Sequence, residues 1–403
     1  MKTEQPRDSG KQELPYIIAL SAGMSPKSES AVIEGVDPET IVVNNNASGL
    51  IARVTGTNKY RVYGTDPIAR VHEFRSPKKW PDNWRFQLSP NRRFPLGPNL
   101  RRTVVLSMKG ESLYDLKRDR LVIGGLEDGF RYLFGTKAYS DNGEFLYITS
   151  KTWLESKPNL IRQISVKTGE LTAKAQIEFP SLEKPRTWVV DIDELILGPS
   201  LKFALSGDTS PRIDKKTVWV FDARDWMGDG HVRLRPIHTL LWDDEKPNER
   251  HSRYRYPFPH TVKFNSQGSL LLIGGHSKTK VVDVNSGELA DDYVSDEECV
   301  AMAISPDNTR ILSLGFYGLT LRELGSSRIL PRIKSLPWDA WRLRAQWDSE
   351  SSNGMKCDLF VINREWTKCI AKEESSFGVF FNGKPIAFTM HTWQIDQPIV
   401  AVD

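Results

Sequence analysis

The residues best suited to chemistry lie in a segment where arginine and aromatic residues alternate. Residues 249–260 read ERHSRYRYPFPH, and their most distinctive side chains are Arg250, Arg253, Tyr254, Arg255 and Tyr256. A guanidinium group binds a carboxylate or a phosphate through two hydrogen bonds and stacks on aromatic rings. The pattern therefore predicts a surface that binds an acidic peptide, a phosphate or a nucleic-acid strand. In the alternative interpretation, these side chains only cover the sheet beneath them.

A second basic segment lies nearer the N-terminus. Residues 75–94, together with Arg101 and Arg102, contain eight lysines and arginines but only one acidic residue, Asp82. The whole chain has a formal net charge of only +4, so this basicity is local and does not favour nucleic acid as the partner. We expect the arginines of both basic segments to be exposed and at most partly paired.

Two histidines and two tryptophans are further candidates for a binding site. His260 and His276 flank one predicted strand pair, and two imidazoles are able to share a metal ion or a phosphate. We favour the alternative that they are turn and capping residues, and we predict no metal and no cofactor. Trp338 and Trp341 lie in the aromatic segment 336–347, where they either contact a ligand or pack within the fold.

Sequence motifs of the common enzyme classes are absent from the chain. It contains no GxSxG, HExxH, GxxxxGK[ST] or CxxC pattern. The absence of a recognisable catalytic set favours binding over catalysis.

A repeated pattern indicates which elements position these residues. Residues 138–150, 263–275 and 303–315 each combine a polar turn with an apolar strand, and 87–94 (QLSPNRRF) is a weaker copy. A second pattern, a strand that runs into a TGEL-like turn, occurs at 162–171 (RQISVKTGEL) and 280–289 (KVVDVNSGEL). Two alternating patterns of this kind predict a fold built from repeated antiparallel strands.

Aligning the chain on the last polar position of the second pattern gives a series of anchor residues. The anchors are Gly64, Asp115, Ser165, Asp222, Asp283, Glu323 and Asn363, at spacings of 51, 50, 57, 61, 40 and 40 residues. A four-stranded blade of a β-propeller repeats every ~40–45 residues, and the longer spacings leave room for insertions. We therefore expect Asp115, Asp222, Asp283 and Glu323 to lie on equivalent strands of successive blades.

These turns and strands resemble the blades of the WD-repeat family of β-propellers over residues 40–330. Val282-Asp283 and Phe221-Asp222 stand where that family usually has Trp-Asp, so the resemblance is to a divergent member. It implies an all-β fold, a single seven-bladed β-propeller with four-stranded WD-like blades. Six or eight blades stay open, because 358–366 (DLFVINREW) fits a second strand as well as a third one.

The propeller is expected to span residues 15–403, after a polar and disordered N-terminal tail at 1–14. Residues 16–22 and 398–403 are interpreted as strands that close the ring by pairing the two ends of the chain. Alternatively, they are strands of separate blades. The Pro- and Arg-rich stretch 70–102 and the polar stretch 226–260 are predicted to be loops.

The predicted function is a scaffold that binds a partner protein or an acidic peptide through the loop-rich top face of the propeller. The loops expected on that face are 75–102, 182–188, 249–260, 295–299 and 336–341. The alternative is an enzyme with a small-molecule site in the axial funnel around His260 and His276. The PFPH run at 257–260, which resembles strand starts of lactonase-type propellers, is the sequence feature behind that alternative.

Features of the whole chain predict where it works. The three cysteines, Cys299, Cys357 and Cys369, are too few for a disulfide framework. No apolar run reaches the ~18 residues that a membrane span needs. Residues 1–15 lack the apolar core of a secretory signal. We therefore expect a protein of the cytoplasm or nucleus, without a membrane partner, acting as a monomer or as part of a complex.

Overall fold

The computed structural model describes the strands of the chain and most of the short turns between them. The described residues are 28–36, 41–44, 47–57, 59–65, 68–75, 96–107, 110–118, 120–124, 136–149, 159–179, 191–208, 216–226, 232–242, 261–275, 278–294, 299–315, 318–330, 345–347, 355–357, 359–362, 366, 368–374, 380–381, 384–385 and 387–394.

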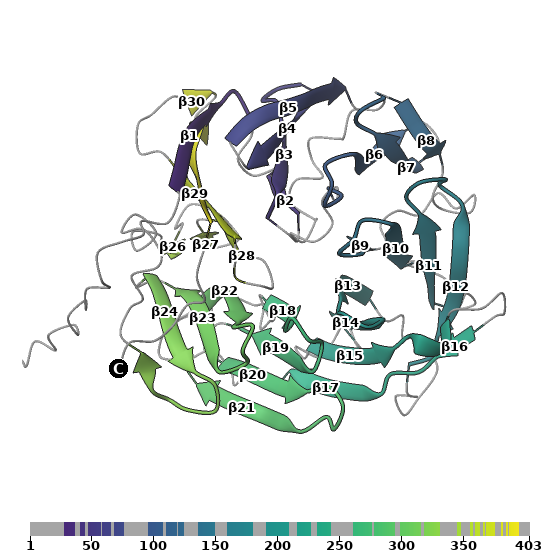
Figure 1. The fold of residues 1–403 in the computed structure, drawn as a ribbon, viewed down its shortest axis with the longest axis vertical. Coiled ribbons are helices and arrows are strands. Elements are labelled where there is room, and N and C mark those ends of the chain that lie inside the picture. Colours follow the sequence, from purple (N-terminus) through teal and green to yellow (C-terminus); the bar gives the residue numbers. More distant parts are fainter. Residues whose placement is uncertain are drawn as a thin grey trace, which may run out of the picture.

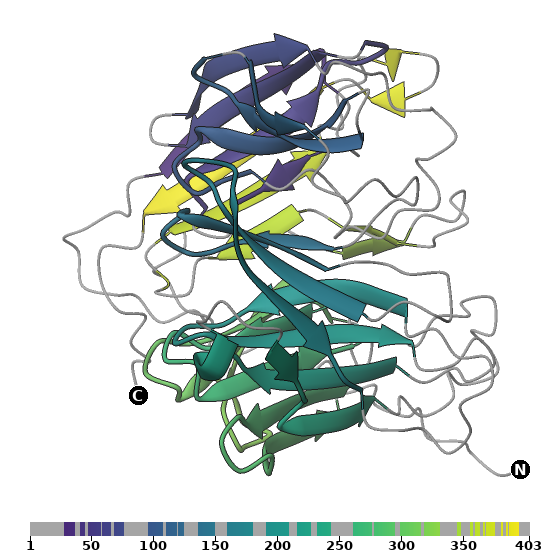
Figure 2. The same ribbon diagram turned by 90° about the vertical axis from the view of Figure 1, so that its right-hand side faces the viewer.

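The regular structure of these residues is almost entirely β. It consists of strands and one short 3-10 turn, η4 (Arg224–Trp226). Neighbouring strands are antiparallel, except for the parallel pair β12–β16. Figure 1 shows the sheets following one another in chain order around a common centre, and Figure 2 shows them from the side. The expected all-β, propeller-like architecture is confirmed.

Within the described residues, seven sheets have three or more strands. The first two in chain order contain β2 (Val42–Val43), β3 (Gly49–Arg53), β4 (Lys59–Thr65) and β5 (Ile68–Arg75), then β6 (Arg102–Ser107), β7 (Gly110–Asp115) and β8 (Arg120–Gly124). The third contains β9 (Lys137–Tyr139), β10 (Phe145–Thr149), β11 (Asn159–Ser165), β12 (Leu171–Ile177) and β16 (Val232–Leu234). The fourth contains β13 (Asp191–Leu197), β14 (Lys202–Asp208), β15 (Lys216–Asp222) and β17 (His238–Trp242).

The remaining sheets follow the same order. The fifth contains β18 (Thr261–Phe264), β19 (Leu270–Gly274), β20 (Lys278–Asp283) and β21 (Leu289–Val294). The sixth contains β22 (Cys299–Ile304), β23 (Arg310–Gly315), β24 (Gly318–Glu323) and β25 (Ile329–Leu330). The seventh contains β28 (Leu359–Ile362), β29 (Lys368–Glu374), β32 (Ala387–Gln394) and β1 (Ser28–Glu34). Two isolated pairs are β26 (Ala345–Trp347) with β27 (Met355–Cys357), and β30 (Phe380–Phe381) with β31 (Lys384–Pro385).

The anchor residues occupy equivalent positions, as one repeated hydrogen bond demonstrates. In six sheets, the backbone N–H of the residue after the anchor donates to a carbonyl at the start of the preceding strand. The acceptor is the residue immediately before that strand. The six bonds are Thr65 to Ser48, Leu116 to Arg101, Val166 to Glu144, Ala223 to Leu201, Val284 to Ser269 and Leu324 to Thr309, at 2.8–3.2 Å. The prediction that Asp115, Asp222, Asp283 and Glu323 lie on equivalent strands is therefore confirmed. Asn363 lies outside the described residues.

Strands from the two ends of the chain pair in one sheet. β1 runs antiparallel to β32 along its whole length, from Ser28 opposite Trp393 to Glu34 opposite Ala387. Residues 16–22 and 398–403, which the sequence predicted for this role, lie outside the described residues. The strand order in this sheet is β28–β29–β32–β1, so β28 lies at an edge. Residues 359–362 therefore form the first strand of this sheet, not its second or third.

The interpretation of 70–102 as a loop is wrong at both ends. β5 continues to Arg75 and β6 begins at Arg102. The reason is packing: Phe74 is buried, and its ring stacks on Tyr60 at a centroid distance of 5.5 Å and on Tyr114 at 5.2 Å. Residues 76–95, which include the weaker repeat copy 87–94, lie outside the described residues. In the β6–β8 sheet, residues 97–101 form the turn before β6, and a hydrogen bond from Gly97 N to Arg102 O closes this turn.

The interpretation of 226–260 as a loop is also wrong in part. Residues 232–234 and 238–242 are the strands β16 and β17, because Leu234 and Trp242 are buried side chains that pack against neighbouring sheets. β16 leaves the connection between β15 and β17 and pairs with residues 175–177 of β12. The connection between two strands of the fourth sheet therefore supplies the edge strand of the third sheet.

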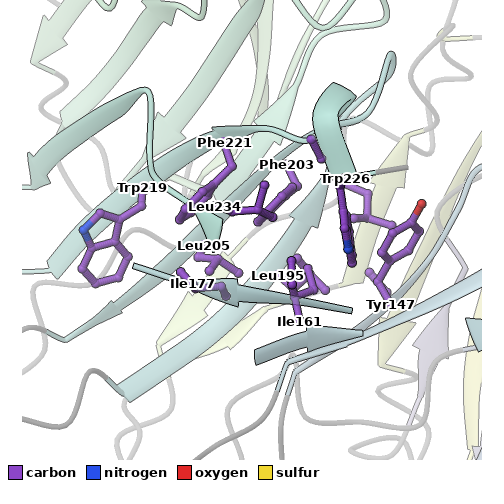
Figure 3. Close-up of a cluster of buried hydrophobic side chains, with 14 of the residues drawn as sticks. Tyr147, Ile161, Ile177, Leu195, Phe203, Leu205, Trp219, Phe221, Trp226 and Leu234 are labelled. Atoms are coloured by element: carbon purple, nitrogen blue, oxygen red, sulfur yellow. The ribbon is translucent and has the colours of Figure 1, made fainter. Parts of the chain in front are cut away.

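The core lies between the sheets. The cluster in Figure 3 joins the third and fourth sheets, with Phe203 stacked on Phe221 at 4.7 Å and Trp226 of η4 beside Tyr147 at 5.6 Å. Trp219 and Phe221 are among its fully buried side chains. Burying a side chain of this size stabilises the fold by ~1.5–3 kcal/mol. Successive sheets are thus held face to face, and the strand ends are left to carry the turns and loops. In the described part of the chain, no helix is long and apolar enough to cross a membrane.

Candidate functional site

The site residues predicted from the sequence lie outside the described residues. They are Arg250, Arg253, Tyr254, Arg255, Tyr256, His260, His276, Trp338 and Trp341. Their grouping on one face stays a prediction. Among the described residues, no group of three or more His, Cys, Asp or Glu side chains is placed to hold a metal ion.

The described arginines of the basic segment nearer the N-terminus, 75–94 with Arg101 and Arg102, differ in their exposure and pairing. Arg75 and Arg101 are exposed, as expected. Arg102 is not, because it forms a close ion pair with the buried Asp115 and its Nε donates to Val166 O at 3.2 Å. The expectation of exposed, partly paired arginines is wrong for Arg102, which links its sheet to the next one.

The antiparallel sheets give the molecule two distinct ends. The turns between the first and second strands, and between the third and fourth, lie at one end, which we call the turn end. The connections between the second and third strands, and between successive sheets, leave from the opposite end, which we call the loop end. Residues 54–57, between β3 and β4, and the end of β5 at Arg75 belong to the loop end.

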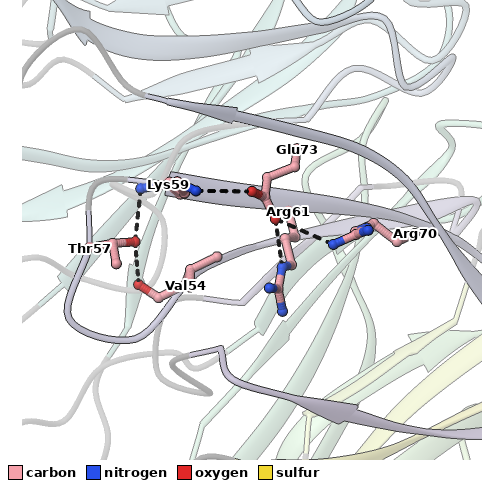
Figure 4. A network of polar contacts seen from close by, with 6 residues as sticks. All are labelled: Val54, Thr57, Lys59, Arg61, Arg70 and Glu73. Carbon is pink, nitrogen blue, oxygen red and sulfur yellow. Dashed lines mark hydrogen bonds and ion pairs between the residues drawn. The ribbon is translucent and has the colours of Figure 1, made fainter.

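A cluster of cations surrounds one carboxylate on the outer strands of the β2–β5 sheet and extends to its loop end. Glu73 of β5 is 2.9 Å from Arg61 Nε, 3.4 Å from Arg70 Nη1 and 3.6 Å from Lys59 Nζ (Figure 4). Arg75, one rung further along β5, lies directly opposite Lys59 in the strand register and is exposed. We call Lys59, Arg61, Arg70, Glu73 and Arg75 the cationic face.

A β-bulge is what brings Arg70 into this cluster. Side chains alternate along a strand, so Arg70 and Glu73, three positions apart, would ordinarily point to opposite sides of the sheet. The register shifts between Val62 and Tyr63, which are opposite His72 and Arg70. Val71 is therefore the extra residue, and Arg70 turns to the side of Glu73. The alternation of the sequence alone hides this arrangement.

Packing on the other side of the strands holds the cationic face in place. Val62, Tyr60 and Phe74 alternate with its charged residues and are buried, and Phe74 stacks on Tyr114 of the next sheet. The turn before Lys59 is fixed by two hydrogen bonds of Thr57, whose Oγ1 donates to Val54 O at 3.0 Å and accepts from Lys59 N at 3.1 Å. The charges therefore stand on a rigid sheet.

The charges of the cationic face do not balance. Three cations contact Glu73 and a fourth, Arg75, lies opposite Lys59, so the described side chains of this face carry an excess of three positive charges. The hydrogen bond that Arg61 donates to Glu73 lowers the pKa of the carboxyl group and raises the pKa of the guanidinium. Arg70 is 56% exposed, so part of this charge faces solvent. The arrangement can attract and hold an anionic group.

The buried ion pairs of the molecule differ from this cluster. Arg322 of β24 pairs one-to-one with Asp291 of β21, and its guanidinium lies 4.2 Å from the centroid of the Tyr293 ring. Both charged side chains are about 5% exposed. A balanced, dry pair of this kind joins two sheets, whereas an unbalanced exposed cluster is suited to a ligand.

Comparisons with known proteins add little. The sequence matches no protein-family profile and no curated protein. Among solved structures, a hydrazine synthase chain of Kuenenia stuttgartiensis aligns with a TM-score of 0.47 and 11% identity, over 89% of this chain and 96% of that one. A chain of a mitotic checkpoint complex aligns with a TM-score of 0.47 and 11% identity, over 95% and 99%. At such distances neither likeness carries an argument about function.

Proposed function

We propose that the chain forms a single seven-bladed, WD-like propeller over residues 15–403 and acts as a scaffold in the cytoplasm or nucleus. Its loop end binds a partner protein or peptide that presents an acidic segment. Seven sheets of three or more strands and the pairing of β1 with β32 support the proposed blade count and closure.

The excess positive charge of the cationic face is the observation that carries the proposed function. Lys59 and Arg75 are held by a rigid sheet at the end from which the long connections leave, and Arg70 reaches toward the same carboxylate from further along β5. The strand that ends at Arg75 continues directly into residues 76–95, whose sequence is also basic. The basic composition of this stretch of sequence has the same sign as the cationic face, which favours a partner with acidic side chains.

A charge-reversal experiment tests this function. The variant Arg70→Glu/Arg75→Glu changes two exposed side chains of the cationic face. The matched control, Lys117→Glu/Lys167→Glu, makes the same change in charge on two exposed lysines at the turn end. Each tagged protein is purified from its native cells, and the bound proteins are quantified by mass spectrometry.

We expect the cationic-face variant to lose specific partners by about tenfold or more, and the control to retain them. Both variants should melt within a few degrees of the native protein, because exposed substitutions change stability little. Equal recovery of every partner by the two variants would overturn the proposed function.

A further inference from the structure

The two outermost charges of the cationic face are opposed in an unfavourable way. Lys59 and Arg75 are direct cross-strand partners. Like charges in that position destabilise a sheet. Glu73 relieves Lys59 from one side, at 3.6 Å. Arg61 and Arg70 approach the same carboxylate, so its single charge is divided among three cations.

The number of charges indicates which anion fits this pair. A second carboxylate would leave about two of the three excess positive charges without a counter-charge. A phosphate monoester carries about −1.5 to −2 charges at neutral pH and has three acceptor oxygens. It therefore neutralises more of the cluster than an Asp or Glu side chain does, and its oxygens can accept from Arg75 and Lys59 together.

We propose that Lys59 and Arg75, with Arg70 beside them, bind a phosphorylated residue of the partner, and that Glu73 is an internal competitor for the same cations. This inference rests on the proposed function and specifies its ligand. Without a ligand, Glu73 offsets the repulsion within the cluster. When the phosphate binds, Lys59 exchanges the distant Glu73 contact for the phosphate, while Arg61 keeps its closer bond to Glu73.

Glu73 gives the inference its most distinctive test. Removing the charge of Glu73 without changing its size, as in Glu73→Gln, frees Lys59 and removes the repulsion between Glu73 and a bound phosphate. A merely structural Glu73 would give weaker binding on substitution, because the face would be disordered. A competitor gives tighter binding.

The first experiment measures binding to defined peptides. The probe is a degenerate acidic peptide library with one central phosphoserine, compared with the same library after phosphatase treatment and with one that has Asp at that position. Fluorescence anisotropy is recorded for the native protein, Arg75→Ala, Arg75→Lys, Glu73→Gln and the turn-end control Lys117→Glu. Melting temperatures check that each variant is folded.

We expect the native protein to bind the phosphorylated library about tenfold more tightly than the other two. Arg75→Ala should lose about fivefold or more of this affinity, Arg75→Lys should lose less, and Glu73→Gln should gain severalfold. Equal binding of all three libraries, or weaker binding by a folded Glu73→Gln variant, overturns the inference. So does displacement of the phosphopeptide by single-stranded RNA at lower concentration, because the ligand is then a nucleic acid.

The second experiment separates this inference from the proposed function. Extracts are treated with phosphatase before the affinity purification described above. Partners that depend on Arg70 and Arg75 should also be lost after phosphatase. If they depend on the two arginines but survive phosphatase, the phosphate is excluded and the acidic-partner scaffold stands. If they depend on neither, both proposals fail.

Discussion

The turn end and the loop end of the sheets are built on different principles. At the turn end, polar side chains connect one sheet to the next: Ser48 Oγ donates to Pro98 O at 2.8 Å, Asn265 Nδ2 to Asn308 Oδ1 at 2.8 Å and Lys202 Nζ to Asn285 Oδ1 at 2.9 Å. Toward the loop end, the cationic face carries charge that the described side chains of its sheet do not neutralise. The contacts that join the sheets thus lie at the end opposite to the proposed binding surface, and we expect that surface to tolerate substitutions without loss of the fold.

The largest effect should come from the buried ion pair that joins the fifth and sixth sheets. Asp291→Ala leaves Arg322 buried without its carboxylate, which should lower the free energy of unfolding by about 3–5 kcal/mol. The comparison variant on the same strand is Asp292→Ala, whose partner Lys278 lies 3.7 Å away in an exposed pair. It should cost less than about 1 kcal/mol. Urea unfolding measures both, and similar costs would contradict the distinction.

Two glycines with similar backbone angles provide a second comparison. Gly287 at the turn end has φ +76°, and a Cβ atom there would overlap the His238 ring, which bonds to Val284 O at 2.9 Å. Gly56 at the loop end has φ +71° and open space around it. Alanine should cost about 2–4 kcal/mol at 287 but only about 1 kcal/mol at 56. Thermal unfolding measures both costs. Because the backbone angles are similar, the difference between the two costs reports the packing at Gly287. Equal costs would show that the turn end tolerates the added methyl group.

Removing a hydrogen-bonding side chain should also cost more stability at the turn end than at the loop end, by a smaller margin. Asn265 is 1% exposed, and its side chain contacts Ser269, Leu270 and the next sheet's Asn308. Asn265→Ala should cost about 1–3 kcal/mol because it leaves buried groups unpaired. Thr57→Ala at the loop end removes two local bonds and should cost about 0.5–1 kcal/mol. Chemical denaturation of the two variants compares the ends directly.

The smallest expected effect is on the stability of the protein at low pH. The backbone N–H of Ser286 lowers the pKa of Asp283, and the side chain of Arg224 lowers that of Asp222. A folded pKa below the unfolded one stabilises the protein above about pH 4, and this contribution is lost as the pH falls through the folded value. Both carboxylates are partly exposed, so each should contribute less than about 1 kcal/mol. Asp283→Asn should flatten the low-pH limb of a stability profile, and an unchanged limb would contradict the assignment.

The turn end was largely predictable from the sequence, because its chemistry is local. Asp283 and Asp222 end their strands and accept hydrogen bonds from residues two or three positions further on. Such contacts leave a signature within ten residues, and the signature repeats. The turn at 97–101 does not match the repeated pattern. In the three copies at 138–150, 263–275 and 303–315, the side chain of Ser140, Asn265 or Ser305 accepts a hydrogen bond from the backbone of the next strand. Gly97 occupies the corresponding position and has no side chain to do so.

Pairing of the two chain ends was predicted, but the cationic face and the strands that pair were not, because both depend on partners distant in the sequence or on register. Arg70 joins Glu73 only through the bulge opposite Val62 and Tyr63. The sequence of β1, SESAVIE, has few apolar residues, so the more apolar 16–22 was the stronger candidate for pairing. The strand is recruited by the backbone edge of β32, and that edge leaves no pattern in residues 28–34.

The pairing of β1 with β32 also determines when the seventh sheet can form during synthesis. Ser28 leaves the ribosome long before its partner Trp393, which lies on the last strand of the same sheet. At about 5–20 residues per second, β1 waits roughly 20–70 s for the strand that it completes. During that interval the seventh sheet does not exist, and β1 is an open edge to which other chains can add. This sheet therefore forms only after β32 has been made, and β1 is exposed to misassembly until then.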